Sequence, residues 1–181
     1  LRDNFFTFYL CSNPRKSKHS AYFSLGAFEL LSLPKYNHSP LDLMRSRTSV
    51  RRYSGELLTG EARQQMELCC KAATAGPFGG TCRFQLIDNH IGSEVPGERV
   101  GAYGMISGAR TYLAGATESK RHGPEDFGYL FELLVLKATD LGLGSCWLGG
   151  AFTRGRFSRA MGLREEEFIP AVSPIGRATR Q

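Results

Sequence analysis

The densest hydrophobic pattern in the chain covers residues 124–141, where apolar side chains leave hardly any polar face. Pro124 suits the first position of a helix, two acidic residues follow it, and Gly142 can take the left-handed conformation that ends one. These features predict a helix from Pro124 to Leu141. A helix that is apolar on nearly all sides is buried in a core or against a partner subunit, and of these we predict a subunit or pseudo-subunit interface.

Shorter patterns predict the remaining elements. Helices are expected over residues 41–47, over 60–73 with Thr59 as N-cap, and from a cap at Thr153 to Gly162. Alternating or short apolar runs predict strands over residues 83–88, 109–116, 145–148 and 169–175. Since helices and strands intermix along the chain, the pattern indicates an α+β or three-layer arrangement.

Residues 1–40 do not share this periodicity. They combine aromatic residues, a basic cluster and an apolar run from Ala21 to Leu33, and we expect a poorly structured extension or a fragment boundary. A signal peptide is the alternative, although the run begins late and no small-x-small cleavage site follows. The length of 181 residues suits one domain, which we place at residues 41–181.

The formal charge of +6 is unevenly distributed. Residues 1–55 hold nine Lys and Arg against three Asp and Glu, whereas residues 56–181 hold fourteen of each sign. The only dense basic stripe is formed by Arg45, Arg47, Arg51 and Arg52. This stripe suits one phosphate better than a duplex, so nucleic-acid binding is the weakest of the functions considered.

Composition excludes several protein classes. No apolar run approaches the roughly 20 residues of a membrane-spanning helix. The five cysteines are odd in number and lack CxxC spacing or a nearby histidine partner, so neither a disulfide framework nor a metal site is indicated. We expect buried thiols in a reducing compartment, the cytoplasm, with Cys69 and Cys70 inside a helix.

Three segments could bind a ligand. In the first, Arg47-Thr48-Ser49-Val50-Arg51, alternate side chains project to one side of an extended chain, so two guanidinium groups and a hydroxyl could converge on a phosphate. The alternative is a solvated basic turn. In the second segment, residues 75–81, glycines would let a flat ligand approach and Phe78 could stack on it. The simpler alternative is an ordinary glycine turn whose aromatic residue lies in the core.

The third segment, residues 141–152, contains two adjacent glycines directly after a short buried stretch. Their backbone N–H groups could donate hydrogen bonds to a ring. Its Leu-Gly-Leu-Gly portion lacks the GxGxxG spacing of dinucleotide sites. The chain has no GxSxG, Walker A or HExxH motif, and its histidines are isolated. We therefore expect no catalytic side chain, and a cofactor would supply the chemistry.

Together these segments resemble the nitroreductase family. RTSVRRY resembles the arginine-x-serine-x-basic signature near the start of such domains, and GLGSCWLGGAF, FxxAMGL and IPAVSPIG resemble their C-terminal portion. The Gly-Pro-Phe-Gly-Gly loop is closest to the putative-nitroreductase branch. The resemblance extends from Pro40 to about Gly176 and implies a three-layer α/β/α domain with a mixed, mainly antiparallel sheet. Related domains continue beyond the last strand, which leaves open a C-terminally incomplete domain.

The resemblance implies FMN as cofactor and NAD(P)H as co-substrate. Arg47 and Ser49 would hold the phosphate and ribityl chain, Arg51 would lie nearer the pyrimidine edge, and Gly149 and Gly150 would offer N–H groups near N5 and O4. The full implied set is Arg47, Thr48, Ser49, Arg51, Pro77, Phe78, Gly79, Leu148, Gly149 and Gly150.

The implied activity is ping-pong electron transfer from NAD(P)H to a nitroaromatic, quinone or similar flat acceptor, in a homodimer or pseudo-dimer. The alternative is a flavin-binding or degenerate domain without turnover.

Overall fold

The computed structural model describes residues 34–89, 106–150 and 152–179. Residues 1–33 of the predicted extension lie outside this range. In chain order the elements are α1 (Pro40–Ser46), α2 (Gly60–Ala72), β1 (Cys82–Asp88), β2 (Thr111–Glu118), α3 (Gly123–Asp140), β3 (Gly144–Ser145), α4 (Arg154–Met161), β4 (Glu167–Phe168) and β5 (Val172–Gly176). Each predicted helix is present, with ends that differ by at most one residue.

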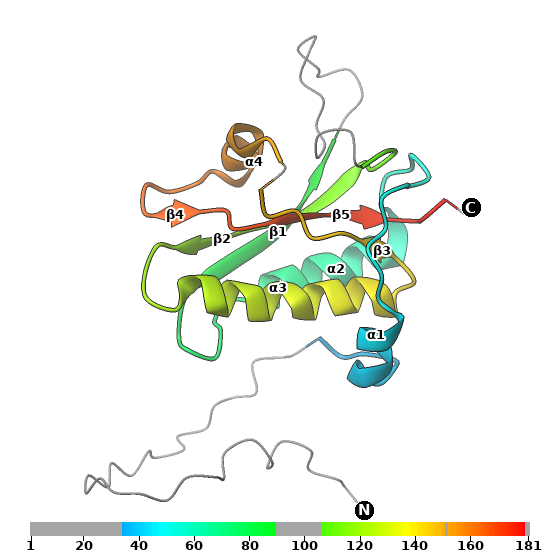
Figure 1. The fold of residues 1–181 in the computed structure, drawn as a ribbon, viewed down its shortest axis with the longest axis horizontal. Coiled ribbons are helices and arrows are strands. Elements are labelled where there is room, and N and C mark those ends of the chain that lie inside the picture. Colours follow the sequence, from blue (N-terminus) through cyan, green and yellow to red (C-terminus); the bar gives the residue numbers. More distant parts are fainter. Residues whose placement is uncertain (1–33, 90–105, 151, 180–181) are drawn as a thin grey trace, which may run out of the picture.

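The strands form one five-stranded sheet in the order β1-β2-β5-β3, with β4 paired to β2. These strand pairs are all antiparallel, and parallel pairing in the described residues is confined to isolated bridges such as Ser49 with Ser145. Helices α2 and α3 cover one face of the sheet and α4 covers the other (Figure 1). The predicted α+β, three-layer arrangement is therefore confirmed.

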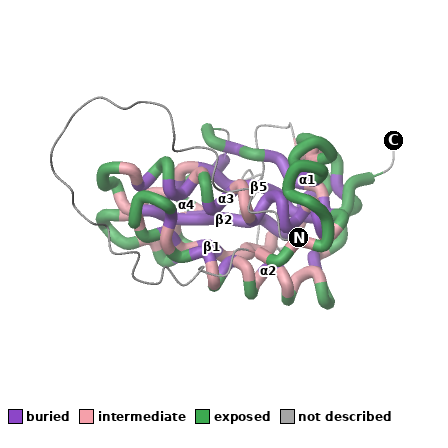
Figure 2. The backbone as a smooth tube through the Cα atoms, turned by 90° about the horizontal axis from the view of Figure 1, so that it is seen from below, coloured by how far each residue is buried: buried purple, intermediate pink, exposed green. Residues whose placement is uncertain are grey.

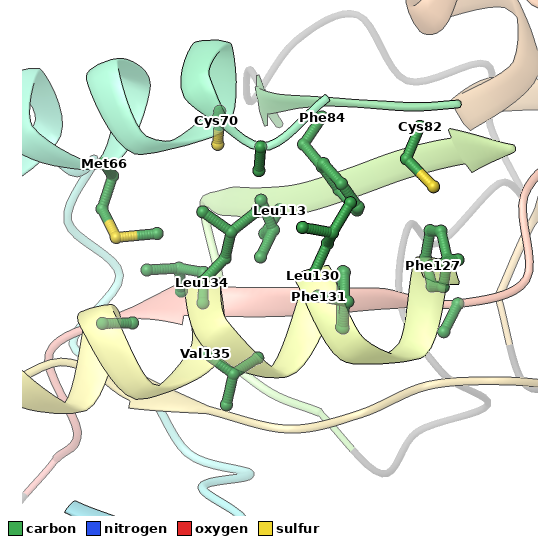
Figure 3. Close-up of a cluster of buried hydrophobic side chains, with 14 of the residues drawn as sticks. Met66, Cys70, Cys82, Phe84, Leu113, Phe127, Leu130, Phe131, Leu134 and Val135 are labelled. Carbon is green, nitrogen blue, oxygen red and sulfur yellow. The ribbon is translucent and has the colours of Figure 1, made fainter. Parts of the chain in front are cut away.

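Alternation along the strands divides the core into two clusters. On β2, Leu113 faces the cluster under α2 and α3, while Tyr112 and Ala114 face the cluster under α4. Figure 3 shows the first cluster, in which Phe127 and Phe131 of α3 point toward the strands. The central strands β2 and β5 are buried along nearly their whole length because both of their faces are covered, whereas β1 is only partly buried.

Helix α3 is covered almost entirely by its own chain. Val135 and Leu136 are fully buried, although they lie on different sides of the helix, and α1 packs on α3 opposite the sheet. Figure 2 shows buried positions along α3, β2 and β5, with exposed positions on α1 and on the outer side of α2. The argument that a second subunit must cover this helix is therefore wrong, since the chain covers it. A dimer itself stays a prediction.

Some predicted details differ from the structure. The predicted strand at residues 145–148 pairs only at its ends, because the Cys146 N–H donates to the Ser173 hydroxyl at 3.0 Å instead of to a backbone carbonyl. Thr59 and Thr153 stand at N-cap positions, but neither side chain makes a capping bond. Gly142 does take the predicted left-handed conformation, with φ of 70°. Among the described helices none is long and apolar enough to cross a membrane.

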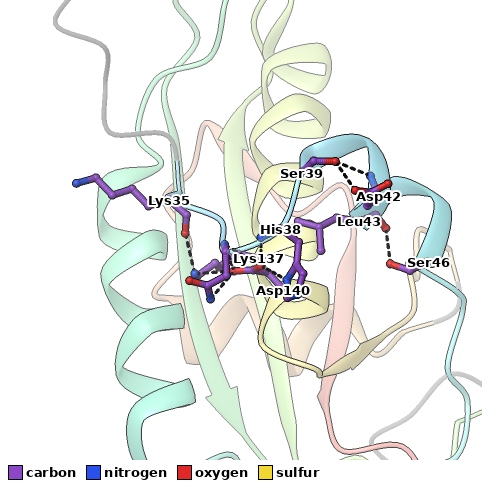
Figure 4. Close-up of polar contacts among 9 residues, drawn as sticks. Lys35, His38, Ser39, Asp42, Leu43, Ser46, Lys137 and Asp140 are labelled. Atoms are coloured by element: carbon purple, nitrogen blue, oxygen red, sulfur yellow. Dashed lines mark hydrogen bonds and ion pairs between the residues drawn. The ribbon is translucent and has the colours of Figure 1, made fainter. Parts of the chain in front are cut away.

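A buried charge cluster attaches the segment before α1 to the end of α3 (Figure 4). The Asp140 carboxylate accepts hydrogen bonds from the backbone N–H groups of Asn37 and His38, from the His38 ring at 2.9 Å and from Lys137 Nζ at 3.1 Å. Lys137 also donates to the carbonyl of Lys35 at 2.8 Å. Residues 35–38 are therefore bonded to the domain directly before Ser39, the N-cap of α1.

Burial by itself raises the pKa of the Asp140 carboxyl, but the hydrogen bonds from Asn37, His38 and Lys137 outweigh it and lower that pKa to about 2. A carboxyl whose folded pKa is depressed stabilises the fold above its unfolded pKa. That stability is lost as the pH falls through the folded value. For Asp140 the window runs from its ordinary value of 3.8 down to about 2.

We expect Asp140→Asn to lower the free energy of unfolding by about 3 to 5 kcal/mol, because the buried Lys137 ammonium would lose its counter-charge. The variant should also lose the part of the acid sensitivity that arises between pH 3.8 and about 2. Urea unfolding across this pH range measures both effects. The double variant Asp140→Asn/Lys137→Met should be more stable than Asp140→Asn alone, and exposed Glu165→Gln should match the wild type; an unchanged stability in Asp140→Asn would refute the role of the cluster.

Candidate functional site

Residues 47–51 run as an extended segment beside β3. Ser49 bridges to Ser145, and the Val50 N–H donates to the Ser145 carbonyl at 2.8 Å. Val50 points inward against Gly144, so closely that a Cβ on that glycine would collide with it. Because side chains alternate along an extended chain, Ser49 and Arg51 lie on the opposite, exposed side. This is the extended conformation that Arg47, Ser49 and Arg51 would need to converge on one phosphate.

Arg47 lies on the same side of the extended segment as Ser49 and Arg51. Its side chain is only 28% exposed and has a carboxylate partner. Its Nε lies 3.9 Å from Glu132 Oε1 on α3, and Glu132 Oε2 accepts a 2.9 Å hydrogen bond from the Trp147 indole. The Trp147 ring meets Phe131 edge-on, with centroids 4.5 Å apart. One carboxylate thus connects the arginine segment with residues 146–150, which places the first and third predicted segments side by side.

The segment after Trp147 leaves backbone donors available. Leu148 is paired in both directions with Val172, at 2.9 and 3.1 Å, so its own peptide groups are used. The Gly149 carbonyl accepts a hydrogen bond from Arg154 at 3.2 Å. Within the described residues, the N–H groups of Gly149 and Gly150 have no hydrogen-bond partner. Both glycines are exposed, so an outside acceptor can reach these donors.

The fold itself gives no reason for glycine at these two positions. Neither Gly149 nor Gly150 has a positive φ. A Cβ on Gly150 would meet nothing within 4 Å, and one on Gly149 would meet only the Pro170 carbonyl at 4.0 Å. A glycine that its own chain does not require keeps the backbone open to another molecule. This favours the ligand-binding interpretation of the third segment.

The glycines of the second segment have internal reasons. A Cβ on Gly76 or Gly80 would collide with the buried Asp126 carboxylate, and Gly79 has φ of 83°. That carboxylate accepts the N–H of Phe78 at 2.8 Å and the N–H of Gly80. The loop is therefore a glycine turn wrapped around an aspartate in the first turn of α3. From the sequence, Asp126 is expected only to complement the helix dipole, whereas its buried carboxylate organises this loop.

Phe78 does not join the core as the simpler interpretation of this loop would require. Its side chain is 62% exposed and stacks on the His122 ring, with centroids 4.8 Å apart. This leaves a preformed aromatic surface beside the N-terminus of α3. In the described part of the chain, no hydrogen bond, ion pair or ring contact joins Pro77, Phe78 or Gly79 to the other two segments.

A cavity of about 740 Å³ lies at the other end of α3, between the residues after Tyr53 and the turn at Gly142. Its polar lining includes Ser54, Glu56 and Arg177. None of the predicted site residues lines it. The structure therefore keeps this cavity apart from the exposed N–H groups of Gly149 and Gly150.

Comparison with known proteins identifies the family and the fold. Residues 41–181 match the sequence model of a family described as "Putative TM nitroreductase". The chain belongs to this nitroreductase family. Membership places it among oxidoreductases. No curated protein matches the chain.

Solved nitroreductases share the fold at low sequence identity. A nitroreductase family protein from Clostridium difficile 630 has a TM-score of 0.61 at 16% identity, over 80% of this chain and 87% of that one. An FMN-dependent nitroreductase from Clostridium difficile R20291 has a TM-score of 0.58 at 18% identity, over 78% and 91%. A nitroreductase family protein from Clostridium novyi NT has a TM-score of 0.59 at 16% identity, over 78% and 86%.

Three neighbours of the predicted residues were not predicted from sequence: Glu132, Trp147 and Arg154. Glu132 could have been noticed as a lone charge within an apolar stretch, and Trp147 as the single tryptophan next to the paired glycines. Arg154 carries no signal, because its contacts with distant carbonyls depend on how the chain returns to the sheet.

The two kinds of glycine predict opposite outcomes in this nitroreductase-family chain. Gly76→Ala should lower the free energy of unfolding by about 1 to 3 kcal/mol, because the new Cβ overpacks a buried carboxylate. Gly150→Ala should leave it unchanged or raise it by up to about 1 kcal/mol, since the site is open and the unfolded chain loses freedom. Urea unfolding of the two variants checks this, and comparable losses in both would contradict the distinction.

Proposed function

We propose that this chain is an FMN-dependent oxidoreductase that binds the flavin across residues 47–51 and 147–150. The observation that carries the proposal is the pair of glycines, Gly149 and Gly150, whose N–H groups are free within the described residues and whose lack of side chains the fold does not need. A planar ring with acceptor atoms on one edge fits such a surface. The FMN-dependent nitroreductase from Clostridium difficile R20291 has a similar fold, which supports FMN as the proposed cofactor.

Basic and hydroxyl groups would hold the phosphate end of the flavin. Arg47 and Ser49 lie on the same side of an extended segment that runs directly beside β3, whereas the exposed Thr48 lies on the other side by the same alternation. Glu132 contacts the Nε edge of Arg47, so the terminal fork of the guanidinium is left to face a phosphate. Arg51 is the next residue on this exposed side of the segment, and it would place positive charge at the pyrimidine edge of the ring.

The bound FMN would supply the hydride and electron chemistry, with NAD(P)H as donor and a flat electron-poor molecule such as a nitroaromatic or quinone as acceptor. The protein would contribute binding, orientation and charge. Leu148 would keep the glycine pair in place through its pairing with Val172. Residues 47–51 and 147–150 contain no histidine or carboxylate that would activate the hydroxyls of Thr48 and Ser49, so the proposed chemistry resides in the cofactor.

A second copy of the chain would complete the site. The aromatic surface of Pro77, Phe78 and Gly79 makes no described contact with the proposed flavin segments, so a partner subunit would bring it over the ring. Four of the exposed large hydrophobic residues support such an interface, because they lie on α1, on α3 and directly after β3: Leu41, Met44, Tyr129 and Trp147.

The cysteines support a reducing location. Cys70, Cys82 and Cys146 are buried free thiols, and Cys69 is half-buried and also free. Burial raises the pKa of the Cys70 thiol to about 12, which makes it unreactive near neutral pH. We propose that the protein acts in the cytoplasm.

Arg47→Ala should weaken FMN binding about 10- to 100-fold, because a charge-assisted hydrogen bond to phosphate contributes about 1.5 to 3 kcal/mol. Riboflavin, which has no phosphate, should bind the variant and the wild type equally. Arg45→Ala is the matched control, since Arg45 is exposed and lies within the same basic stripe. Fluorescence titration measures each of these affinities. Wild-type FMN affinity in Arg47→Ala would show that this segment is a solvated turn.

Sedimentation at micromolar concentration should show a dimer, and Leu41→Glu/Met44→Glu should dissociate it, because the double variant puts two charges into an apolar interface. Leu68→Glu, at an equally exposed position on α2, should leave the dimer intact. A wild-type monomer, or a double variant that still dimerises, would exclude this interface.

A further inference from the structure

Arg154, the first residue of α4, connects two distant stretches of backbone. Its Nη1 donates to the Ile169 carbonyl at 3.1 Å, and its Nη2 donates to the Gly149 carbonyl at 3.2 Å. The guanidinium also lies over the Phe152 ring, 5.0 Å from its centroid. Arg154 therefore holds the proposed flavin-binding loop against the chain that leads into β5.

The electrostatics of α4 do not explain an arginine at this position. A helix N-terminus carries positive partial charge, which disfavours a cation in the first turn. The first turn of α4 contains no acidic residue that would offset this. The two carbonyl bonds, together with the contact to the Phe152 ring, are consequently the interactions that account for Arg154.

The bond to Gly149 has a geometric consequence for Gly150. The Gly149 carbonyl and the Gly150 N–H belong to one planar peptide unit, and in a trans peptide they point in opposite directions. An arginine that fixes the oxygen on one side therefore fixes the N–H on the other. This N–H is one of the two exposed donors that have no partner within the described residues.

Few other contacts restrain this peptide. Leu148 is fixed by its pairing with Val172, but the following unit lies between two glycines, whose backbones rotate more freely than those of any other residue. Among the described residues, Arg154 makes the only hydrogen bond to the Gly149–Gly150 unit. A cation on the oxygen also polarises the peptide and strengthens the N–H as a donor.

We propose that Arg154 is a positioning residue that orients and polarises the Gly149–Gly150 peptide, so that the Gly150 N–H faces an acceptor atom of a bound planar heterocycle. The inference rests on the proposed function for the identity of that heterocycle, the isoalloxazine ring of FMN. The orientation of the peptide itself depends only on contacts within the chain.

The test compares Arg154→Met, Arg154→Lys and Arg159→Met by ¹H–¹⁵N NMR of the ¹⁵N-labelled protein, first without and then with FMN. Arg159 is the matched control, because it is exposed on the same helix and does not contact the loop. Without FMN, Arg154→Met should move the Gly150 amide peak, Arg154→Lys should move it less, and Arg159→Met should leave it in place. With FMN, the wild-type peak should shift downfield, and Arg154→Met should lose that shift and bind FMN about tenfold more weakly.

The outcomes separate the two claims. An unmoved Gly150 peak in flavin-free Arg154→Met would overturn the inference whether or not FMN binds. If the wild type binds no FMN, the proposed function fails, and the role of Arg154 in ligand binding fails with it. If FMN binds the wild type and Arg154→Met equally well and shifts Gly150 equally in both, the inference fails while the proposed function stands.

Discussion

The burial of helix α3 is the constraint on which the rest of the structure depends. Its apolar residues fill the space between the sheet, α2 and α1, and this fixes where its few polar side chains emerge. Asp126 at its start holds the aromatic loop, Glu132 in its middle meets Arg47 and Trp147, and Asp140 at its end holds the segment before α1. Because the helix cannot shift without exposing its core, each of these polar groups has a fixed position.

The glycines distinguish structure from function more clearly than the charged residues do. At Gly76, Gly79 and Gly80 the fold demands glycine, through a buried carboxylate or a positive φ. At Gly149 and Gly150 the fold does not require glycine. The exposed N–H groups there are oriented by the pairing of Leu148 with Val172 and by the bond from Arg154. The two loops look alike in sequence, yet they serve different purposes. The first loop shapes an aromatic surface, and the second carries the donors that we propose for a ligand.

Membership of the nitroreductase family and the local geometry are independent arguments for the proposed flavin site. The family match covers residues 41–181 and says nothing about individual contacts. The contacts show an arginine segment paired to β3 and joined through Glu132 to the glycine loop. Among the described residues the aromatic surface at Phe78 makes no contact with either segment, as a site shared between two subunits would require.

The sequence by itself determined the helices, the placement of most strands and the extended form of residues 47–51, because these depend on local periodicity, caps and alternation. Short sequence motifs also indicated the resemblance to the nitroreductase family. Only the tertiary structure decided that the chain covers α3 by itself, that Asp126 organises the loop at Phe78, and that Arg154 binds the Gly149 carbonyl. These contacts join residues far apart in the chain or groups of the backbone, and no local pattern of side chains encodes which carbonyl a distant arginine will meet.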